Sequence, residues 1–222
     1  MRTWYLPNSP GGITAALLTT PPATANTASE WRFANASEKA NNGEVSRLSL
    51  VGIRGVTSFA APGSTSDCDA PPFDFGGVLY TELLSGIFSA AEWTLRERCR
   101  ASGGAGVSQN RDRWLVSKGV ATDGSDATLL TPAHLLSNQV GIATADTQDY
   151  VTTWDAPEIE LRGERLFFSL AKQLMVATTT SGGGNTRDAM LQVGVALASI
   201  AGPDLMPLPP VGLEETVGMI PA

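Results

Sequence analysis

The sequence predicts an all-β fold, a two-sheet antiparallel sandwich of the jelly-roll type with an extended arm at each end. Three observations predict it. Short segments in which apolar and polar residues alternate recur from about residue 46 to residue 200. Turns rich in glycine lie between these segments, in a chain with 23 glycines and 14 prolines among its 222 residues. No segment places apolar residues at helical spacing over several turns.

Residues 1–45 are expected to form the N-terminal arm. They are rich in Thr, Ala, Pro, Asn and Ser, and most of them follow neither the period of a strand nor that of a helix. Short strands are predicted at 2–6 and 30–33. Trp4 and Trp31 lie in these strands, and an exposed tryptophan on a loose arm is unfavourable, so we expect both rings to anchor the arm against a surface.

Residues 46–200 are expected to hold the sandwich itself. Its clearest strand is 150–154, in which every residue is aromatic or β-branched. The segment 158–162 then alternates strictly, with its two apolar residues on one face. The alternation resumes over 165–170 after a turn predicted at 163–164.

Further strands are predicted from the same alternation, at 45–53, 78–84, 93–100, 112–118 and 190–195. Glu97 interrupts the apolar face of its strand, which is therefore expected to be half-exposed or bulged there. The sequence also allows a single helical turn around 131–136, because proline suits the first turn of a helix. Turns rich in glycine or aspartate are predicted at 102–106, 122–126 and 181–185.

Residues 201–222 are expected to form the C-terminal arm. Its five prolines cannot donate ladder hydrogen bonds, so the arm is predicted to be extended and not a strand. The arm is nevertheless apolar, and it needs a surface to lie on, either on its own domain or on a neighbouring subunit. We expect that deleting residues 203–222 weakens partner binding or oligomerisation and leaves the β domain folded. The candidate partner-binding residues of the two arms are Trp4, Tyr5, Leu205, Met206, Leu208, Val211, Leu213, Met219 and Ile220.

The net charge of −7, from 15 Lys and Arg against 22 Asp and Glu, argues against two classes of partner. Binding to nucleic acid or to an anionic membrane depends on clustered Lys and Arg, so we expect neither partner. Pro7 and Pro10 interrupt the beginning of the chain, so no targeting signal is expected there. The longest apolar stretch, near 189–201, is too short and broken to span a bilayer. We expect a soluble protein made in a cytoplasm.

No set of residues predicts catalysis, a cofactor or a metal ion, so the sequence predicts a protein without enzymatic activity. His134 is the only histidine, which excludes a zinc site built on a histidine pair, and no serine lies in a nucleophile elbow. The glycine runs at 103–106 and 182–184 open no helix and are interpreted as hairpin tips. The Asp-rich segments 67–69 and 123–126 fall short of the oxygen ligands that calcium takes and are interpreted as turns.

Three features leave alternatives open. Cys68 and Cys99 stay as two thiols in a reduced compartment, which we expect, or they pair. Glu158 and Glu160 share one face of a strand, as in a jelly-roll glycosidase, but the solvent face of an alternating strand also accounts for them. Tryptophans would suit a carbohydrate-binding module if they formed an exposed row, although core packing is expected for those within strands. The five are Trp4, Trp31, Trp93, Trp114 and Trp154.

Four blocks of the sequence, taken together, resemble those of a known family of proteins. They are the opening strand 2–6 before a Thr/Ala/Ser-rich stretch, the block 79–98 with its Glu-Trp-Thr-Leu element, the paired strands of 150–174 around Gly-Glu-Arg-Leu, and the triple glycine before 186–193. Together they resemble virion-associated β-sandwich proteins of tailed bacteriophages. The resemblance covers most of residues 1–196, and the loop 60–75 and the C-terminal arm depart from it. It implies a jelly-roll fold, a structural role in the virion and no catalytic residues.

The resemblance and the arms together lead us to expect a structural protein of a phage virion that acts as an oligomer. We favour a head decoration or cement protein bound to the major capsid protein, because apolar arms suit a subunit that clasps its neighbours. Such a protein is made in the host cytoplasm and ends on the particle surface, with which an acidic exterior is compatible. The alternatives are a neck, tail or fibre component and a carbohydrate-binding β-sandwich module.

Overall fold

The computed structural model of the chain describes residues 1–7, 14–22, 31–34, 46–53, 57–58, 77–102, 107–132, 135–138, 140–143, 147–177, 188–192 and 198–210. Every regular element within these stretches is a β-strand, which confirms the predicted all-β sandwich. None of the described residues belongs to a helix long and apolar enough to cross a membrane. The strands are β1 (Arg2–Tyr5), β2 (Thr14–Ala16), β3 (Trp31–Ala34), β4 (Ser46–Ile53), β5 (Thr57–Ser58), β6 (Gly77–Tyr80), β7 (Leu84–Phe88), β8 (Ala91–Ser102), β9 (Val107–Gly119), β10 (Thr128–Leu129), β11 (Leu135–Leu136), β12 (Val140–Ala143), β13 (Thr147–Ala156), β14 (Ile159–Ala177), β15 (Asp188–Gln192), β16 (Ser199–Gly202) and β17 (Leu205–Met206).

One layer of the sandwich is built around β8. On one side β8 pairs with β13, from Ala91 opposite Ala156 to Arg100 opposite Thr147. On its other side β8 pairs with β16 and with β15, which continue the layer to β1 and to β3. β3 pairs in turn with β4, and β4 with β5. All of these pairings are antiparallel.

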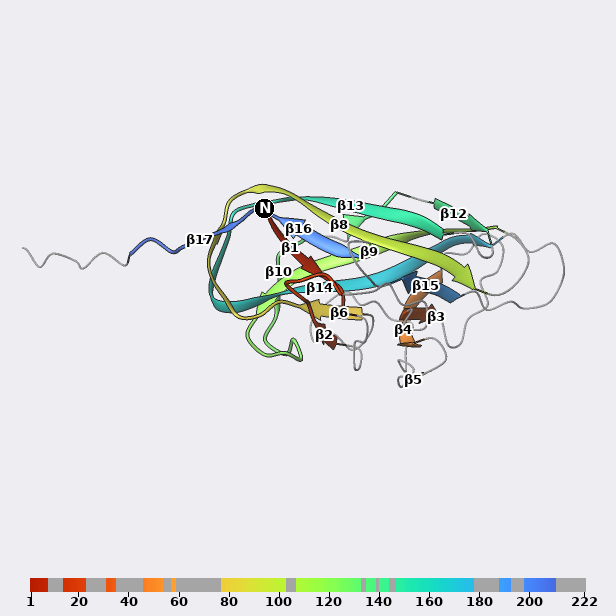
Figure 1. Cartoon of the computed structure of the whole chain (residues 1–222), viewed down its shortest axis with the longest axis horizontal. Coiled ribbons are helices and arrows are strands. Elements are labelled where there is room, and N and C mark those ends of the chain that lie inside the picture. Colours follow the sequence, from red (N-terminus) through yellow and green to blue (C-terminus); the bar gives the residue numbers. More distant parts are fainter. Residues whose placement is uncertain are drawn as a thin grey trace, which may run out of the picture.

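The second layer is built around the long β9–β14 pair (Figure 1). The short strands β10, β11 and β12 lie along the other edge of β9. β6 and β4 lie along the other edge of β14, and β2 joins β6 in a parallel pairing. The first residues of β14 leave this layer and pair with β7, which pairs with β17. The bend in β14 therefore carries the chain to the end of the sandwich where β17 lies.

The core between the layers is centred on Trp93 of β8. Its ring is stacked on that of Trp4 with 5.9 Å between centroids, and it meets Phe88 edge-on at 5.1 Å. From the opposite layer Phe168 approaches to 6.1 Å. All four side chains have no exposed surface, and burying one such side chain contributes about 1.5–3 kcal/mol. The core therefore packs residues from the beginning and the middle of the chain against a residue of the second layer of the sandwich.

Two predictions about the interior of strands are wrong. Glu97 is neither half-exposed nor bulged: it is 1% exposed, and its pairing with Tyr150 lies in an unbroken register. The long β8–β13 pairing fixes which residues face inward, and this overrides the polarity of one side chain. The predicted turn at 163–164 is a bulge within β14, where Gly163 has a φ of 77° and the register with β7 shifts.

Two predictions about segments outside the main strands also differ from the structure. The single helical turn allowed around 131–136 is not formed in its described part, because Thr131 accepts a hydrogen bond from the amide of Val116 at 3.2 Å and residues 135–136 form β11. The C-terminal arm was expected to contain no strand, yet residues 205–206 form β17 between two prolines. Its pairing with β7 needs only two residues, which the proline spacing leaves available.

The remaining strand and turn predictions compare as follows. The predicted strand 78–84 is divided between β6 and β7. The turn predicted at 122–126 is confirmed, with the Gly124 amide donating to the Ala121 carbonyl at 3.0 Å. The turns predicted at 102–106 and 181–185 lie mostly or wholly outside the described residues. β16 spans the predicted boundary between residues 200 and 201, so the beginning of the predicted C-terminal arm lies within the sandwich.

Candidate functional site

The segment that the sequence selects for partner binding begins at β17. We call β17 together with residues 207–210 the terminal edge. β17 pairs antiparallel with β7, with Leu205 opposite Phe88 and Met206 opposite Ile87. Leu205 packs against the main core, and the chain then runs outward from the body of the sandwich (Figure 1, blue). The terminal edge is therefore anchored at its start and projects beyond it.

Two glycines let the C-terminal strands approach the rest of the fold. Gly86 in β7 has a φ of +153°, and a Cβ atom there would lie 2.4 Å from the main-chain oxygen of Met206 and 2.7 Å from Cγ of Leu205. A Cβ atom on Gly202 in β16 would lie 2.6 Å from the ring of Trp93. Side chains at these two positions would push β17 and β16 away from the sandwich.

The N-terminal strand secures the neighbouring corner by polar contacts. Arg2 forms an ion pair with Glu82, and its guanidinium lies 5.1 Å from the ring centroid of Trp4. Nε1 of Trp4 donates to the second oxygen of Glu82 at 3.3 Å. The amino group of Met1 lies 2.6 Å from the carboxylate of Asp204, next to the start of β17. β1 and the terminal edge are thus held at the same end of the molecule.

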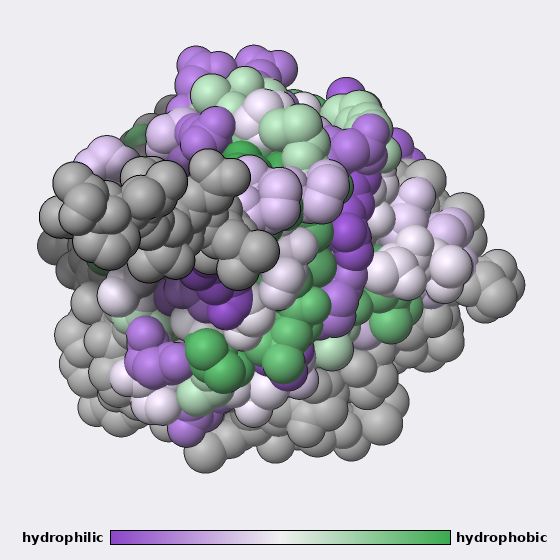
Figure 2. Space-filling view, turned by 90° about the vertical axis from the view of Figure 1, so that its left-hand side faces the viewer, coloured by the Kyte–Doolittle hydropathy of each residue, from purple (hydrophilic) through white to green (hydrophobic). Residues whose placement is uncertain are grey.

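The terminal edge exposes apolar surface. The side chain of Met206 is 46% exposed, Pro207, Pro209 and Pro210 are exposed, and Leu208 is half-buried. Figure 2 looks onto the end of the sandwich from which this segment leaves, and hydrophobic residues lie there beside a band of hydrophilic ones. An exposed apolar segment without titratable side chains is suited to binding a partner.

The structure separates the candidate partner-binding residues into three groups. Trp4 lies wholly in the core and offers no surface to a partner. Tyr5 is half-buried, and its amide donates to the Leu18 carbonyl at 2.8 Å. Leu205, Met206 and Leu208 come together in the terminal edge. The other four lie outside the described residues: Val211, Leu213, Met219 and Ile220.

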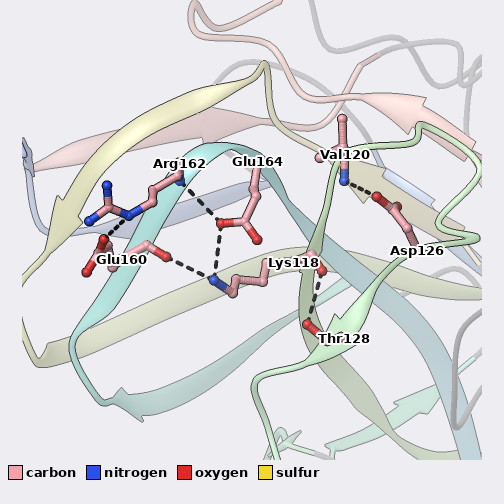
Figure 3. A network of polar contacts seen from close by, with 7 residues as sticks. All are labelled: Lys118, Val120, Asp126, Thr128, Glu160, Arg162 and Glu164. Carbon is pink, nitrogen blue, oxygen red and sulfur yellow. Dashed lines mark hydrogen bonds and ion pairs between the residues drawn. The ribbon is translucent and has the colours of Figure 1, made fainter.

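A network of polar side chains braces the bulge in β14 (Figure 3). Nζ of Lys118 donates to the carbonyl oxygen of Glu160 and to Oε2 of Glu164, both at 3.1 Å. The amide of Arg162 donates to the same oxygen of Glu164 at 3.3 Å. These bonds tie β9 to both sides of the bulge, so the network holds the bend that positions β7 and β17.

The carboxylate pair considered for glycoside hydrolysis lies beside this network. Glu158 and Glu160 are exposed, while Ile159 and Leu161 are buried, as expected for the solvent face of an alternating strand. Oε1 of Glu160 forms an ion pair with Nε of Arg162 at 2.5 Å. Both carboxylates therefore lie on the solvent-exposed face of the strand and not in a sugar-binding cleft built from described residues.

The Asp-rich segment 123–126 is a hydrogen-bonded turn. Asp126 accepts hydrogen bonds from the amides of Val120 and Ala121 at 2.8 and 3.0 Å, and Asp123 accepts one from the amide of Ser125 at 3.0 Å. These amide donors lower the pKa of both carboxyl groups. Within the described stretches no three His, Cys, Asp or Glu residues are placed to hold a metal ion. Residues 67–69 lie outside the description.

The tryptophans form no exposed row in the part of the chain with described side chains. Trp4, Trp93 and Trp114 have no exposed surface, and Trp154 is 5% exposed. A sugar-binding face would need such rings in solvent. Cys99 is buried in the core as well. The side chain of Trp31, and the residues Cys68 and His134, lie outside the description.

Polar groups are also buried between the layers. Burial raises the pKa of Asp112 on β9, and the nearby side chain of Trp114 opposes this effect. Burial raises the pKa of Tyr150 on β13, and the negative charges of Cys99 and Asp112 raise it further. These groups lie in the interior and bear on stability rather than on binding.

Sequence reasoning missed four residues that position the terminal edge: Glu82, Gly86, Arg165 and Gly202. Arg165 donates to the carbonyl oxygens of Val120 and Thr81 at 3.2 and 2.9 Å, which joins the end of β9 to the segment before β7. A glycine inside a strand is a signal of close backbone approach, but the predicted strand 78–84 ends before Gly86, so this signal was not available for it. The two charged residues carry no such local signal.

No family model and no curated protein matches the chain. Among solved structures, a CocE/NonD family hydrolase from Staphylococcus aureus matches with 5% identity and a TM-score of 0.49, over 92% of this chain and 36% of that protein. An α-amino acid ester hydrolase matches with 13% identity and a TM-score of 0.46, over 91% and 36%. An aminopeptidase from a marine sediment Thaumarchaeota archaeon matches with 10% identity and a TM-score of 0.45, over 90% and 36%.

These comparisons contradict the prediction of a protein without enzymatic activity, which is withdrawn, because the matching structures with the higher TM-scores, 0.45 to 0.49, are hydrolases and a peptidase. The chain spans about a third of their length, and the activities in their names belong to those whole proteins. At lower TM-scores of 0.28 and 0.25, the chain matches a carbohydrate-binding module and a protein of deformed wing virus, a honeybee pathogen. The identities are 14% and 10%, over 73% and 92% of this chain and 77% and 55% of those proteins.

Proposed function

We propose that this chain is a structural protein of a tailed-phage virion that binds neighbouring subunits through its terminal edge. Its most specific form is a head decoration or cement protein on the major capsid protein, made in the host cytoplasm and located on the particle surface as an oligomer. The proposal rests on one observation: an exposed apolar segment leaves the sandwich after β17 and projects beyond it.

The geometry at the start of the segment supports a binding role. Leu205 packs against the core and Met206 is paired with Ile87, so the projecting residues leave the body from a fixed point. Anchoring one end reduces the freedom that a partner would otherwise have to remove on binding. Each subunit of an assembly could then add an arm contact to the contact made by its sandwich, which raises avidity.

The composition of the chain is compatible with this role. A net charge of −7 favours a place on the outside of a particle over contact with packaged DNA. The resemblance of the four sequence blocks to phage virion proteins supports the same assignment. The buried tryptophans reduce the support for a carbohydrate-binding module, because they offer no stacking platform.

Quantitative mass spectrometry of purified particles tests the proposal. A copy number close to that of the major capsid protein is the expected result for a decoration protein. A handful to a few dozen copies would move the assignment to a neck, tail or fibre component. Absence from the particle would reject a virion role.

A binding assay with matched variants tests the terminal edge itself. The variant Met206→Ala with Leu208→Ala is expected to bind particles that lack this protein at least about tenfold more weakly than the unaltered chain. The control, Leu136→Ala with Val151→Ala, removes two exposed apolar side chains elsewhere on the surface, which are 44% and 37% exposed. Equal loss in both variants would show that the terminal edge has no special part in binding.

A further inference from the structure

We propose that residues 206–210 are a polyproline II ligand that binds an aromatic-lined groove on the partner protein. This inference rests on the proposed function, in which the terminal edge contacts another protein, and it specifies the chemistry of that contact. The segment reads Met-Pro-Leu-Pro-Pro and lies at the point where the chain leaves the sandwich.

The backbone of the segment is confined to extended conformations before any partner arrives. Proline fixes φ near −65° at Pro207, Pro209 and Pro210. Met206 and Leu208 each precede a proline, and a residue before proline is kept out of the helical region. No helix or further strand is assigned to residues 207–210. Binding would therefore cost little backbone entropy.

The distribution of hydrogen-bonding groups selects the mode of recognition. Three of the five residues have no amide hydrogen, so the segment cannot donate the regular ladder that strand addition requires. Its carbonyl oxygens can still accept hydrogen bonds, and its rings are exposed. Tryptophan and tyrosine side chains offer a flat apolar face together with an N–H or O–H donor. A groove lined by such residues therefore fits both features of the segment.

The repeat of a polyproline II helix defines which face binds. With three residues per turn, Pro207 and Pro210 lie along one edge, and Leu208 lies between them on the next. Met206 is 46% exposed and continues the apolar surface towards the sandwich. The groove is expected to hold the two prolines in adjacent sites and to contact Leu208 at its side.

Charge indicates what surrounds the groove. No Lys or Arg occurs in residues 201–222, and the charged residues of this stretch are Asp204, Glu214 and Glu215. Acidic residues that flank a ligand are favoured by a partner surface of opposite charge. We expect Lys or Arg at the rim of the aromatic groove.

An NMR titration of the full chain tests the inference with a defined probe. The chain is labelled with 15N and with 13C-proline, and the probe is a purified SH3 domain with a basic rim around its aromatic groove. The expected result is a saturable shift of the Leu208 amide and of the ring carbons of Pro207, Pro209 and Pro210. Replacing the three prolines by alanine is expected to weaken binding about tenfold or more.

Two variants make the test specific. Pro207→Leu with Leu208→Pro keeps the composition and the extended backbone but removes the spacing of three between Pro207 and Pro210, so it is expected to lose binding as well. The control, with Pro21, Pro132 and Pro157 replaced by alanine, removes three exposed prolines elsewhere and is expected to bind as the unaltered chain does.

Three outcomes would overturn the inference: no saturable shift, equal binding by the spacing variant, or concentration-dependent shifts of the same signals without probe, which would indicate self-association. The copy-number measurement is independent of this titration. If the protein is present in particles but the titration shows no saturable shift, only the polyproline II mode of binding is rejected. If the protein is absent from particles but binds the probe specifically, only the virion role is rejected.

Discussion

At the scale of single residues, Gly86 determines how closely β17 can approach β7. A Cβ atom at this position would meet the main-chain oxygen of Met206 at 2.4 Å, and its φ of +153° is unfavourable for any other residue. Gly86→Ala is therefore expected to displace β17 and to lower the free energy of unfolding by about 1–3 kcal/mol. Urea unfolding measures this loss, and limited proteolysis is expected to cut faster within residues 205–210.

Gly163 provides the matched control. Its φ of +77° is also in the left-handed region, but a Cβ atom there would meet nothing within 4 Å. Gly163→Ala is expected to cost about 1–2 kcal/mol through backbone strain in the bulge and to increase proteolysis at the terminal edge less than Gly86→Ala does, because its Cβ atom would not meet β17. An unchanged proteolysis rate in Gly86→Ala would show that β17 does not depend on this close approach.

Tyr150 is expected to make stability fall at alkaline pH. Burial, together with the charges of Cys99 and Asp112, raises the pKa of its hydroxyl in the folded chain above the ordinary value of about 10. The unfolded chain therefore loses this proton first as the pH rises through about 10, which favours unfolding. The stabilising contribution is complete below pH 10 and is lost above it.

The comparison of the unaltered chain with Tyr150→Phe isolates this effect. Between pH 10 and 11 the free energy of unfolding of the unaltered chain is expected to fall by up to about 1.4 kcal/mol more than that of the variant. Urea unfolding at a series of pH values from 8 upward measures both. Parallel curves for the two proteins would contradict the raised pKa.

At the scale of elements, β17 separates the stable part of the C-terminal segment from the projecting part. Deleting residues 207–222 removes no described strand and is expected to leave the free energy of unfolding within about 0.5 kcal/mol of the full chain. Deleting residues 203–222 also removes the contact of Leu205 with the core and is expected to cost about 1–3 kcal/mol. Thermal and urea unfolding of the two truncated chains decide this; equal stability would place β17 outside the cooperative fold.

Elements with a strong local period could be predicted from the sequence, and elements defined by distant pairing could not. The alternation in 158–162 correctly predicts that Ile159 and Leu161 face inward. The same period cannot show that β14 continues through a bulge, because Lys118 and Glu164 hold that bulge from different strands. β17 was missed for a related reason, since two residues between prolines have no period of their own.

The candidate site shows the same division. Composition alone indicated that the C-terminal segment is extended and apolar, and Met206 and Leu208 do lie in the terminal edge. The sequence also predicts Trp4 as a partner-binding residue, because the residues that it contacts in the core are not near it in the sequence. Its core contact, Trp93, lies far along the chain, and the pairing of β1 with β16 brings together residues about two hundred positions apart. Sequence patterns predict which residues are buried, and the topology of the sheets determines which other residues they pack against.

At the scale of the whole molecule, this topology makes the two ends of the chain part of one folded unit. β1 pairs with β16 from Arg2 opposite Gly202 to Tyr5 opposite Ser199, and Trp4 lies in the same core as residues of both layers. Removing Trp4 should therefore weaken the entire sandwich. Trp4→Ala is expected to lower the free energy of unfolding by about 3–5 kcal/mol, a large share of the roughly 5–15 kcal/mol of a typical domain.

The form of the unfolding transition tests the same point. Because Trp4 belongs to the common core, the variant is expected to unfold in a single transition, with tryptophan fluorescence and far-UV circular dichroism giving the same urea midpoint. Tyr5→Ala, which alters the half-buried neighbour in the same strand, is expected to shift that midpoint less. A separate early transition in Trp4→Ala, with the main midpoint unchanged, would mean that β1 is an independent attachment. A single shifted transition would mean that β1, which the sequence predicts as part of an arm, is an integral strand of the sandwich. The residues after β17 are then the part of the described chain that projects from the sandwich.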